Sequence, residues 1–248
     1  MFKDLFSDAS TDYARHRPAY PRELYDHLAK TAPALDCAWD CATGSGQAAR
    51  GLAEYFARVI ASDASAEQIA AAAPHPGVDY RVAPAHACGL NDTSVDLVTV
   101  AQALHWFDLD AFYADVRRVL RPGGILGVWT YNLLHTEPAI DELLEHFYRN
   151  TVGPCWPPER RWVENGYRDL PFPFRELDPP SCAMQADWTL PQLLGYLGTW
   201  SASKKYQADR GHDPVAVLEP TLRAAWGLPE TCRTIRWPLA IRIGVHQS

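Results

Sequence analysis

The run DCATGSG at residues 40–46 combines an acidic residue with two closely spaced glycines. Gly44 and Gly46 allow a sharp backbone turn and leave no Cβ in the way of an approaching ligand. With Ala49 three positions after the second glycine, the spacing satisfies a G-x-G-x-x-A nucleotide fingerprint. Asp63 ends the later run VIASD, where a carboxylate can accept hydrogen bonds from both hydroxyls of a ribose. Together these residues predict an adenosine cofactor and leave its identity open.

Asp40 helps to distinguish two such cofactors. In a dinucleotide fingerprint, the residues before the first glycine end a buried apolar strand, where an ionised carboxylate is costly without a cationic partner. S-adenosylmethionine carries an ammonium and a sulfonium group that offset this cost, whereas a dinucleotide has no cation near this turn. Asp40 therefore favours S-adenosylmethionine, with an NAD(P)-dependent oxidoreductase as the alternative.

A second group of polar residues follows the apolar run at 95–100. Gln102, His105 and Trp106 come after a predicted strand, at the sheet edge where ligands of such folds bind. We expect Gln102 to contact the cofactor and His105 to face the substrate, because a histidine titrates near neutrality and can act as a general base. In the alternative reading, His105 caps the next helix and Trp106 packs against it.

These groups require a scaffold of alternating strands and helices. Apolar runs predict strands over 37–42, 59–63, 78–83, 95–100, 125–129 and 235–245. Helical periodicity predicts helices over 49–56, 109–120, 138–149, 191–206 and 214–226, and one more begins after Ser65, which forms a capping box with Gln68. Strands separated by helices pair in parallel, so the predicted class is a doubly wound α/β sheet.

The chain changes character after residue 132, and 12 of its 20 prolines and six of its nine tryptophans occur from Pro154 onward. We expect one domain over 1–248, with an N-terminal segment at 1–34 and a cofactor-binding core at 35–132. Helical cap insertions and a sixth strand occupy 133–234, and a closing strand occupies 235–248.

Composition excludes several kinds of partner. A net charge of −7 and no basic run longer than two residues argue against nucleic acid. The sequence lacks an uninterrupted apolar run of about 18 residues, and its beginning is too polar for a signal peptide, so we expect a cytoplasmic protein without membrane contact. The six cysteines include no C-x-x-C pair, which indicates reduced thiols and no metal site.

Several motifs now point to one family. The run DCATGSG with Asp63 resembles the first two motifs of class I S-adenosylmethionine-dependent methyltransferases. The runs SVDLVTVAQALHWFD and LRPGGILGVW resemble the fourth-strand and fifth-strand signatures of the type 11 small-molecule branch. The segments YARHRPAYP and LGTWSASKKY are similar to the trans-aconitate methyltransferase-like group. The resemblance covers nearly the whole chain.

The resemblance implies a Rossmann-like, mostly parallel seven-stranded sheet with a helical cap, and S-adenosyl-L-methionine as the cofactor. It also implies that the N-terminal segment 1–34 covers this cofactor. It implies in-line transfer of a methyl group to a small-molecule acceptor, with the carboxylate of a small organic acid as the expected target. A carboxylate acceptor needs no general base, whereas a hydroxyl or amine acceptor would use His105. We expect a monomer or weak homodimer.

The implied site residues fall into two sets. The cofactor-binding set is Tyr13, Arg17, Asp40, Ala42, Gly44, Gly46, Asp63, Ala64, Ala85, His86 and Gln102. The substrate-binding set is Tyr20, Trp106 and Trp200. The chain departs from the family at Ala42, which replaces a glycine and is tolerated if its φ is negative, and at His86, which replaces an acidic residue. These departures keep open a non-catalytic methyltransferase-fold binding protein.

Overall fold

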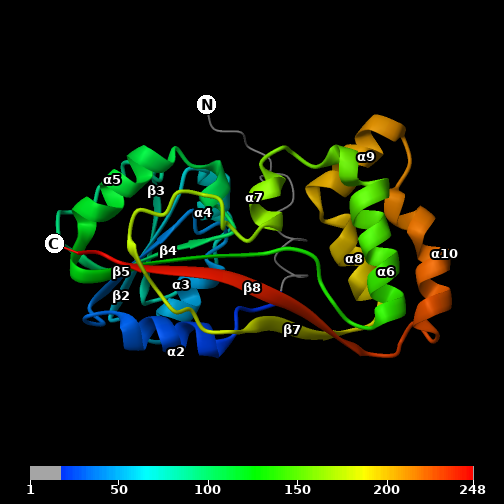
Figure 1. Ribbon diagram of the computed structural model, residues 1–248, viewed down its shortest axis with the longest axis horizontal. Coiled ribbons are helices and arrows are strands. Elements are labelled where there is room, and N and C mark those ends of the chain that lie inside the picture. Colours follow the sequence, from blue (N-terminus) through cyan, green and yellow to red (C-terminus); the bar gives the residue numbers. More distant parts are fainter. Residues whose placement is uncertain (1–17, 248) are drawn as a thin grey trace.

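A mostly parallel sheet forms the centre of the computed structural model, which describes residues 18–247 (Figure 1). Its order is β3-β2-β1-β4-β5-β8-β6, and β7 pairs with β8 beside this path. The parallel strands are β1 (Cys37–Cys41), β2 (Arg58–Asp63), β3 (Val78–Val82), β4 (Val95–Ala101) and β5 (Leu120–Tyr131). The antiparallel β8 (Arg233–Val245) pairs with β5, β6 (Arg175–Leu177) and β7 (Ala183–Trp188). The predicted Rossmann-like sheet is confirmed.

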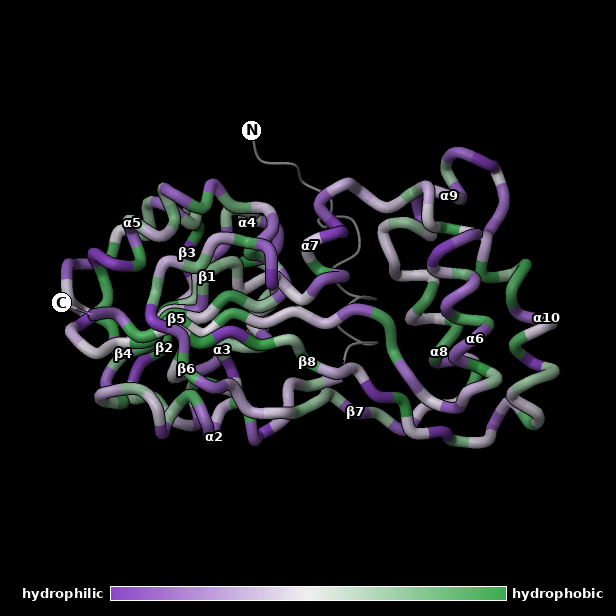
Figure 2. The backbone as a smooth tube through the Cα atoms, viewed as in Figure 1, coloured by the Kyte–Doolittle hydropathy of each residue, from purple (hydrophilic) through white to green (hydrophobic). Residues whose placement is uncertain are grey.

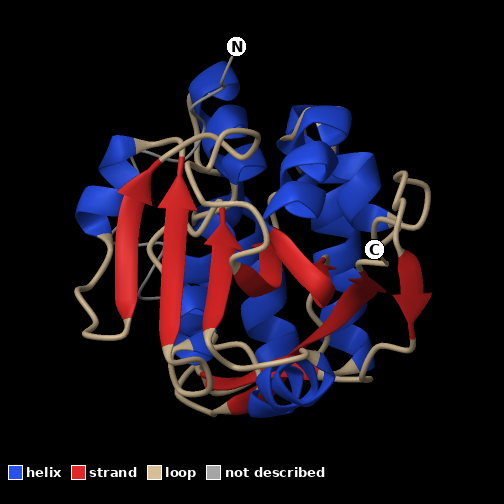
Figure 3. Cartoon of the chain, turned by 90° about the vertical axis from the view of Figure 1, so that its left-hand side faces the viewer, coloured by secondary structure: helices blue, strands red, loops and turns tan. Residues whose placement is uncertain are grey.

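Helices lie on both faces of this sheet (Figure 3). One face is covered by α2 (Arg22–Thr31) and α3 (Gln47–Leu52), whose buried side chains join the Ala38 side of β1. The other face is covered by α5 (Leu109–Val119) and α7 (Arg160–Glu164), which join the Trp39 side of β1. The alternation along β1 follows from the two-residue period of a strand, and it gives the sheet a hydrophobic core on each face.

Local sequence signals explain where α4 (Ala66–Ala71) begins and how closely α2 packs against the sheet. Ser65 caps α4 by accepting a hydrogen bond from the Gln68 backbone N–H, which confirms the predicted cap. On β5, a Cβ at Gly127 would lie 2.9 Å from a methyl carbon of Leu28. The missing side chain therefore lets α2 approach the sheet closely.

The cap consists of helices at one end of the molecule (Figure 1). They are α6 (Pro138–His146), η3 (Phe147–Thr151), η4 (Gly153–Cys155), α8 (Leu190–Gly198), α9 (Ser201–Arg210) and α10 (Pro214–Trp226). Hydrophobic and hydrophilic segments alternate along α6 and α10 (Figure 2). Their buried residues belong to the same hydrophobic cluster as the α2 face of the sheet. A continuous core therefore joins the cap to the sheet.

The chain differs from the predicted elements at several places. The helix predicted over 191–206 is two helices, because the chain turns at Thr199 and Trp200 between α8 and α9. The helix predicted over 138–149 changes to a wider π turn at Phe147. Strand β5 begins at Leu120, so the Arg-Pro-Gly-Gly run lies inside it. Helix α2 was not predicted, and the range 133–234, where one strand was expected, contains the two strands β6 and β7.

None of the helices within residues 18–247 combines the length and apolar character needed to cross a membrane.

Candidate active site

The glycine turn after β1 encloses Asp40. One Asp40 carboxylate oxygen accepts a hydrogen bond from the Thr43 hydroxyl at 2.5 Å, and the other accepts one from the Thr99 hydroxyl on β4 at 2.8 Å. Only 1% of Asp40 is exposed. The carboxylate thus ties the turn to the neighbouring strand.

Burial raises the pKa of Asp40 to about 6, although hydrogen bonds from Thr43 and Thr99 oppose the rise. No lysine or arginine pairs with Asp40 among the residues that the structure describes. Hydroxyl partners compensate a buried negative charge less than a cation does. This carboxylate is therefore a site where a positively charged ligand nearby would be favourable.

Asp63, at the end of β2, orders the same turn from the other side. One of its oxygens accepts from the Gly44 N–H and the other from the Ser65 N–H, both at 2.9 Å. Gly44 and Gly46 have φ values of +55° and +81°, which favour glycine. Around a Cβ placed on Gly44, the nearest described atom is Gln68 Oε1 at 3.8 Å, so the turn leaves space beside its backbone.

Two residues that are not glycine also have a left-handed backbone near this turn. Ala42 and Gln102, at the ends of β1 and β4, have φ values of +55° and +57°. The condition expected for Ala42, a negative φ, is therefore not met, and its Cβ adds strain at the turn. Such conformations cost of order 1–3 kcal/mol and cluster at functional sites. Both lie at the carboxyl edge of the sheet.

Gln102 is held against β5. Its side-chain nitrogen donates to the Tyr131 carbonyl at 2.8 Å, and its side-chain oxygen accepts a short hydrogen bond from the Thr130 hydroxyl. The Gln102 backbone N–H also donates to the Trp129 carbonyl. These bonds fix the left-handed residue in place, and its predicted contact with the cofactor stays a prediction.

His105 lies in the short helix η2 (Leu104–Trp106) directly after β4. Its Nδ1 is 2.8 Å from the hydroxyl of Tyr167, and its ring lies 4.6 Å from that of Trp106. Burial, assisted by the positive charge of Arg160, lowers the pKa of His105 to about 3. The imidazole is therefore neutral at every pH near neutrality.

Arg160 of α7 is a site residue that the sequence analysis missed. Its Nε donates to the Tyr148 hydroxyl and its Nη2 to Asn132 Oδ1, both at 2.8 Å. Its guanidinium also lies over the Trp156 ring, 4.5 Å from the centroid. Within residues 18–247 it forms no ion pair, and Glu164 reaches it only through the Tyr148 hydroxyl. The sequence feature that could have identified Arg160 is its position between the Pro157-Pro158 pair and Trp162.

The predicted substrate-binding residues lie in different places. Tyr20 packs edge-on against Trp129 of β5, with ring centroids 5.3 Å apart. Trp106 lies beside His105. Trp200 belongs to an aromatic cluster of the cap, where its ring lies 5.7 Å from that of Trp156. Tyr148 and Trp156 each contact both Trp200 and Arg160, and so connect this cluster to the sheet edge.

The remaining predicted cofactor residues lie on loops or outside the described residues. Ala64 follows Asp63 directly and is exposed, and so is His86 in the loop after β3, while Ala85 is half-buried. This loop is at the edge where an adenine would extend beyond Asp63. Tyr13 and Arg17 lie outside the described residues.

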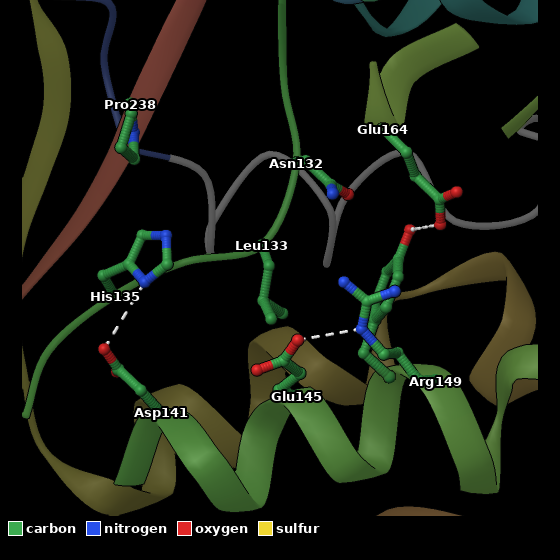
Figure 4. A pocket seen from close by; sticks show the side chains of 9 residues that line it. Asn132, Leu133, His135, Asp141, Glu145, Arg149, Glu164 and Pro238 are labelled. Carbon is green, nitrogen blue, oxygen red and sulfur yellow. Dashed lines mark hydrogen bonds and ion pairs between the residues drawn. The ribbon is translucent and has the colours of Figure 1, made fainter. Parts of the chain in front are cut away.

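A cavity of about 320 Å³ lies beside α6 (Figure 4). Two of its lining residues, Asn132 and Tyr148, are the hydrogen-bond partners of Arg160. The other lining residues are Leu133, His135, Asp141, Glu145, Arg149, Glu164 and Pro238. Its size is in the range of small-molecule sites, and its lining is mostly polar.

The turn residues fit S-adenosylmethionine. Asp40 is a buried carboxylate without a described cationic partner, and the turn at Gly44 is open beside its backbone. The Tyr80 hydroxyl, next to the position that a Cβ of Gly46 would fill, is buried and has no hydrogen-bond partner within the described part of the chain. A ligand with a cationic end and several hydroxyls can satisfy these groups.

Comparisons with known proteins support this assignment. A family model described as a methyltransferase domain matches residues 39–128. A Dictyostelium discoideum protein with the provisional name of methyltransferase is 33% identical over 229 residues, covering 91% of this chain and 87% of its own. An uncharacterized methyltransferase of Mycobacterium tuberculosis is 39% identical over 126 residues, about half of each chain.

A solved structure from Anaeromyxobacter dehalogenans, provisionally named a type II methyltransferase, has a TM-score of 0.89 and 49% identity, and covers 93% of this chain and 98% of its own. The glycine turn, the acidic residues that order it and these relationships lead to one conclusion. The chain belongs to the class I S-adenosylmethionine-dependent methyltransferases.

Proposed function

We propose that the enzyme methylates a carboxylate oxygen of a small, polar organic acid. The observation that carries this proposal is Arg160, a guanidinium without an ion-pair partner among the described residues. Arginine presents a planar set of donors that matches a carboxylate. The resemblance to trans-aconitate methyltransferases supports the same acceptor class.

The contacts of Arg160 orient it for this purpose. Tyr148 and Asn132 take one N–H each from Nε and Nη2, and the Trp156 ring supports the guanidinium plane. The Nη1 group makes no hydrogen bond within residues 18–247. Aromatic rings stabilise a cation without neutralising its charge. Arg160 therefore keeps both charge and donors for an anionic acceptor.

The cavity beside α6 is proposed to hold the rest of the acceptor. Its carboxylates have internal partners: Asp141 accepts from the Thr136 N–H, Glu145 pairs with Arg149, and Glu164 accepts from Tyr148. A polar acceptor can form hydrogen bonds with these lining groups. An alkyl chain would remove water from them without replacing the lost hydrogen bonds. The part of the acceptor away from its reacting carboxylate is thus proposed to be short, polar and rich in hydrogen-bond donors, because carboxylates accept hydrogen bonds and repel a second anion.

The methyl donor is proposed to bind along the ends of β1, β2 and β3. When bound, S-adenosylmethionine supplies a methyl group that is already activated for displacement. Asp63 is positioned for the ribose, Ala64, Ala85 and His86 for the adenine, and Ala42, Gly44 and Gly46 for backbone contacts. Asp40 acts as a buried negative charge, and Tyr13 and Arg17 are proposed to lie at the methionine end.

The protein's part in the reaction is alignment and exclusion of water. A small carboxylic acid is ionised near neutrality, so its oxygen is a nucleophile without a base. Arg160 and His105 are proposed to orient that oxygen on the sheet edge, while Trp106 and Tyr20 limit the space around it. Trp200 supports the aromatic cluster behind Arg160.

An acceptor panel tests this proposal. Small polar acids, their amides and matched alcohols, phenols and amines would be incubated with S-adenosylmethionine, and S-adenosylhomocysteine release would be measured. We expect turnover of acids and not of their amides, with a methyl ester identified by mass and by its loss in alkali. Methylation confined to amines or phenols would contradict the carboxylate assignment.

A further inference from the structure

Tyr167, between α7 and β6, is a strained and buried residue directly beside His105. It is 1% exposed, and its φ of +62° follows a φ of +65° at Gly166. The Arg242 side chain donates to the Tyr167 carbonyl at 2.8 Å. A bulky residue adopts a left-handed backbone only where its surroundings impose it. The fold thus holds this side chain against the end of β4.

The phenol oxygen of Tyr167 meets the start of η2. It lies 2.8 Å from His105 Nδ1 in this short helix. Burial raises the pKa of Tyr167, and the nearby N–H groups of Leu104 and His105 offset the rise only in part. The phenol is therefore un-ionised near neutrality and keeps its hydrogen to donate.

The direction of the bond between Tyr167 and His105 follows from the remaining donors. The Gln102 side-chain nitrogen donates to the Tyr131 carbonyl, which leaves the Gln102 side-chain oxygen as an acceptor. The Thr130 hydroxyl, also near the phenol, gives its hydrogen to that oxygen. The phenol hydrogen needs an acceptor because Tyr167 is buried, and His105 Nδ1, at 2.8 Å, is positioned to accept it.

We propose that Tyr167 is a positioning residue that donates its hydrogen to His105 Nδ1 and so fixes His105 as the tautomer with hydrogen on Nε2. On the proposed function, the Nε2–H then donates to the acceptor carboxylate beside Arg160. His105 serves as a hydrogen-bond donor and not as a general base, because Nε2, its other ring nitrogen, already carries the proton.

The electrostatic surroundings agree with this assignment. A second proton on His105 would break the bond from Tyr167 and place a cation near Arg160 of α7. Burial and the Arg160 charge lower the pKa of His105 to about 3. Among the described residues, the charged or titratable groups that face the imidazole are Arg160 from α7 and Tyr167 from the segment after it. The donor is therefore present at every working pH.

Nitrogen NMR of the full chain tests the tautomer without any acceptor. The imidazole signals of His105 would be identified by their absence in His105→Gln, and couplings to the ring C–H protons show which nitrogen carries hydrogen. We expect a protonated Nε2, a bare Nδ1 and no titration between about pH 5 and 9. In Tyr167→Phe we expect a mixture of tautomers. A bare Nε2 in the unchanged protein would overturn the proposal.

Side-chain replacements test the donor role. Glutamine places an N–H near the position of Nε2, so His105→Gln should lose only about threefold in kcat/KM, whereas His105→Leu should lose about thirtyfold, the effect of one hydrogen bond to a charged group. Equal losses in both variants, with a histidine inflection in the wild-type rate, would indicate a base instead. The NMR experiment contains no acceptor, so its result does not depend on the acceptor class. A wrong carboxylate assignment can therefore be distinguished from a wrong tautomer assignment.

Discussion

The two sides of the sheet edge differ in charge. At the ends of β1 and β2, the buried carboxylates Asp40 and Asp63 surround the glycine turn. Near the end of β5, Arg160 lies over aromatic rings beside a neutral histidine. We refer to the first pair as the acidic side and to Arg160 with His105 as the basic side. This difference matches a cationic methyl donor on one side and the proposed anionic acceptor on the other.

Removing the charge of the basic side should have the largest effect. Arg160→Gln should lower kcat/KM for an acid acceptor by about a hundredfold, since a charged hydrogen bond contributes roughly 1.5–3 kcal/mol and its loss leaves the acceptor unneutralised. Cofactor affinity should change little. Steady-state kinetics and calorimetry measure the two effects.

Arg161→Gln is the matched control, because Arg161 is the exposed neighbour on the same helix and lies over the Trp162 ring. Equal losses in both variants would mean that general positive charge matters and not the position of Arg160.

On the acidic side, Asp63→Asn should weaken binding of S-adenosylhomocysteine by about 2 kcal/mol, or roughly thirtyfold. Because Asp63 also accepts from the Gly44 and Ser65 N–H groups, we expect a modest fall in melting temperature as well. Asp79→Asn, on the neighbouring strand β3, should leave affinity unchanged. A change below about half a kcal/mol in Asp63→Asn would argue against the ribose contact.

Asp40→Asn should change the stability of the protein and its affinity for S-adenosylmethionine in opposite directions. The folded pKa of about 6 lies above the ordinary 3.8, so ionising Asp40 lowers the free energy of unfolding as pH rises from about 4 to 6. The asparagine variant should therefore be about 1 kcal/mol more stable near pH 7 and lose this pH dependence. Thermal melts across this range measure it.

The same substitution should weaken S-adenosylmethionine about tenfold near pH 7, because a bound cation favours the ionised carboxylate. Affinity of the unchanged protein should rise with pH through about 6, and that of the variant should not. A pH-independent wild-type affinity would show that Asp40 only shapes the turn.

The smallest effect concerns the strained turn. Ala42→Gly should stabilise the protein by about 1 kcal/mol, since glycine adopts the φ of +55° without cost from a Cβ. Cofactor affinity should stay equal or increase. Thr93→Gly, with a φ of +48° in the turn before β4, should add stability without affecting affinity. A loss of stability in Ala42→Gly would mean that the methyl group packs favourably.

The sequence predicts the parts whose signals are local. The strands β1 to β4 and the helix α10 lie within two residues of their predicted bounds, because apolar runs and caps mark them. The family relationship confirms the methyltransferase assignment and the cofactor, and it excludes the oxidoreductase alternative. It also favours an enzyme over a binding protein.

Long-range contacts explain what the sequence analysis missed. Tyr167 lies 62 residues from His105, and Asn132 lies 28 residues from Arg160. Arg160 belongs to a helix of five residues after a proline pair, too short for a periodic signal. Strand β7 depends on pairing with β8, and the break between α8 and α9 depends on packing of Trp200. Such features arise only when the cap folds onto the sheet.

Strand β8 has a mechanical consequence for the cap. Its second half pairs with β5 over Leu239–Val245, and its first half pairs with β7 over Arg233–Pro238. The strand therefore runs without a break from the parallel sheet to the cap. Bending it would break inter-strand hydrogen bonds to β5 or to β7. A hinge through β8 is disfavoured, so the acceptor meets a space whose shape is set before it arrives. Selection among the proposed acid acceptors would then rest on how well each fits that fixed space.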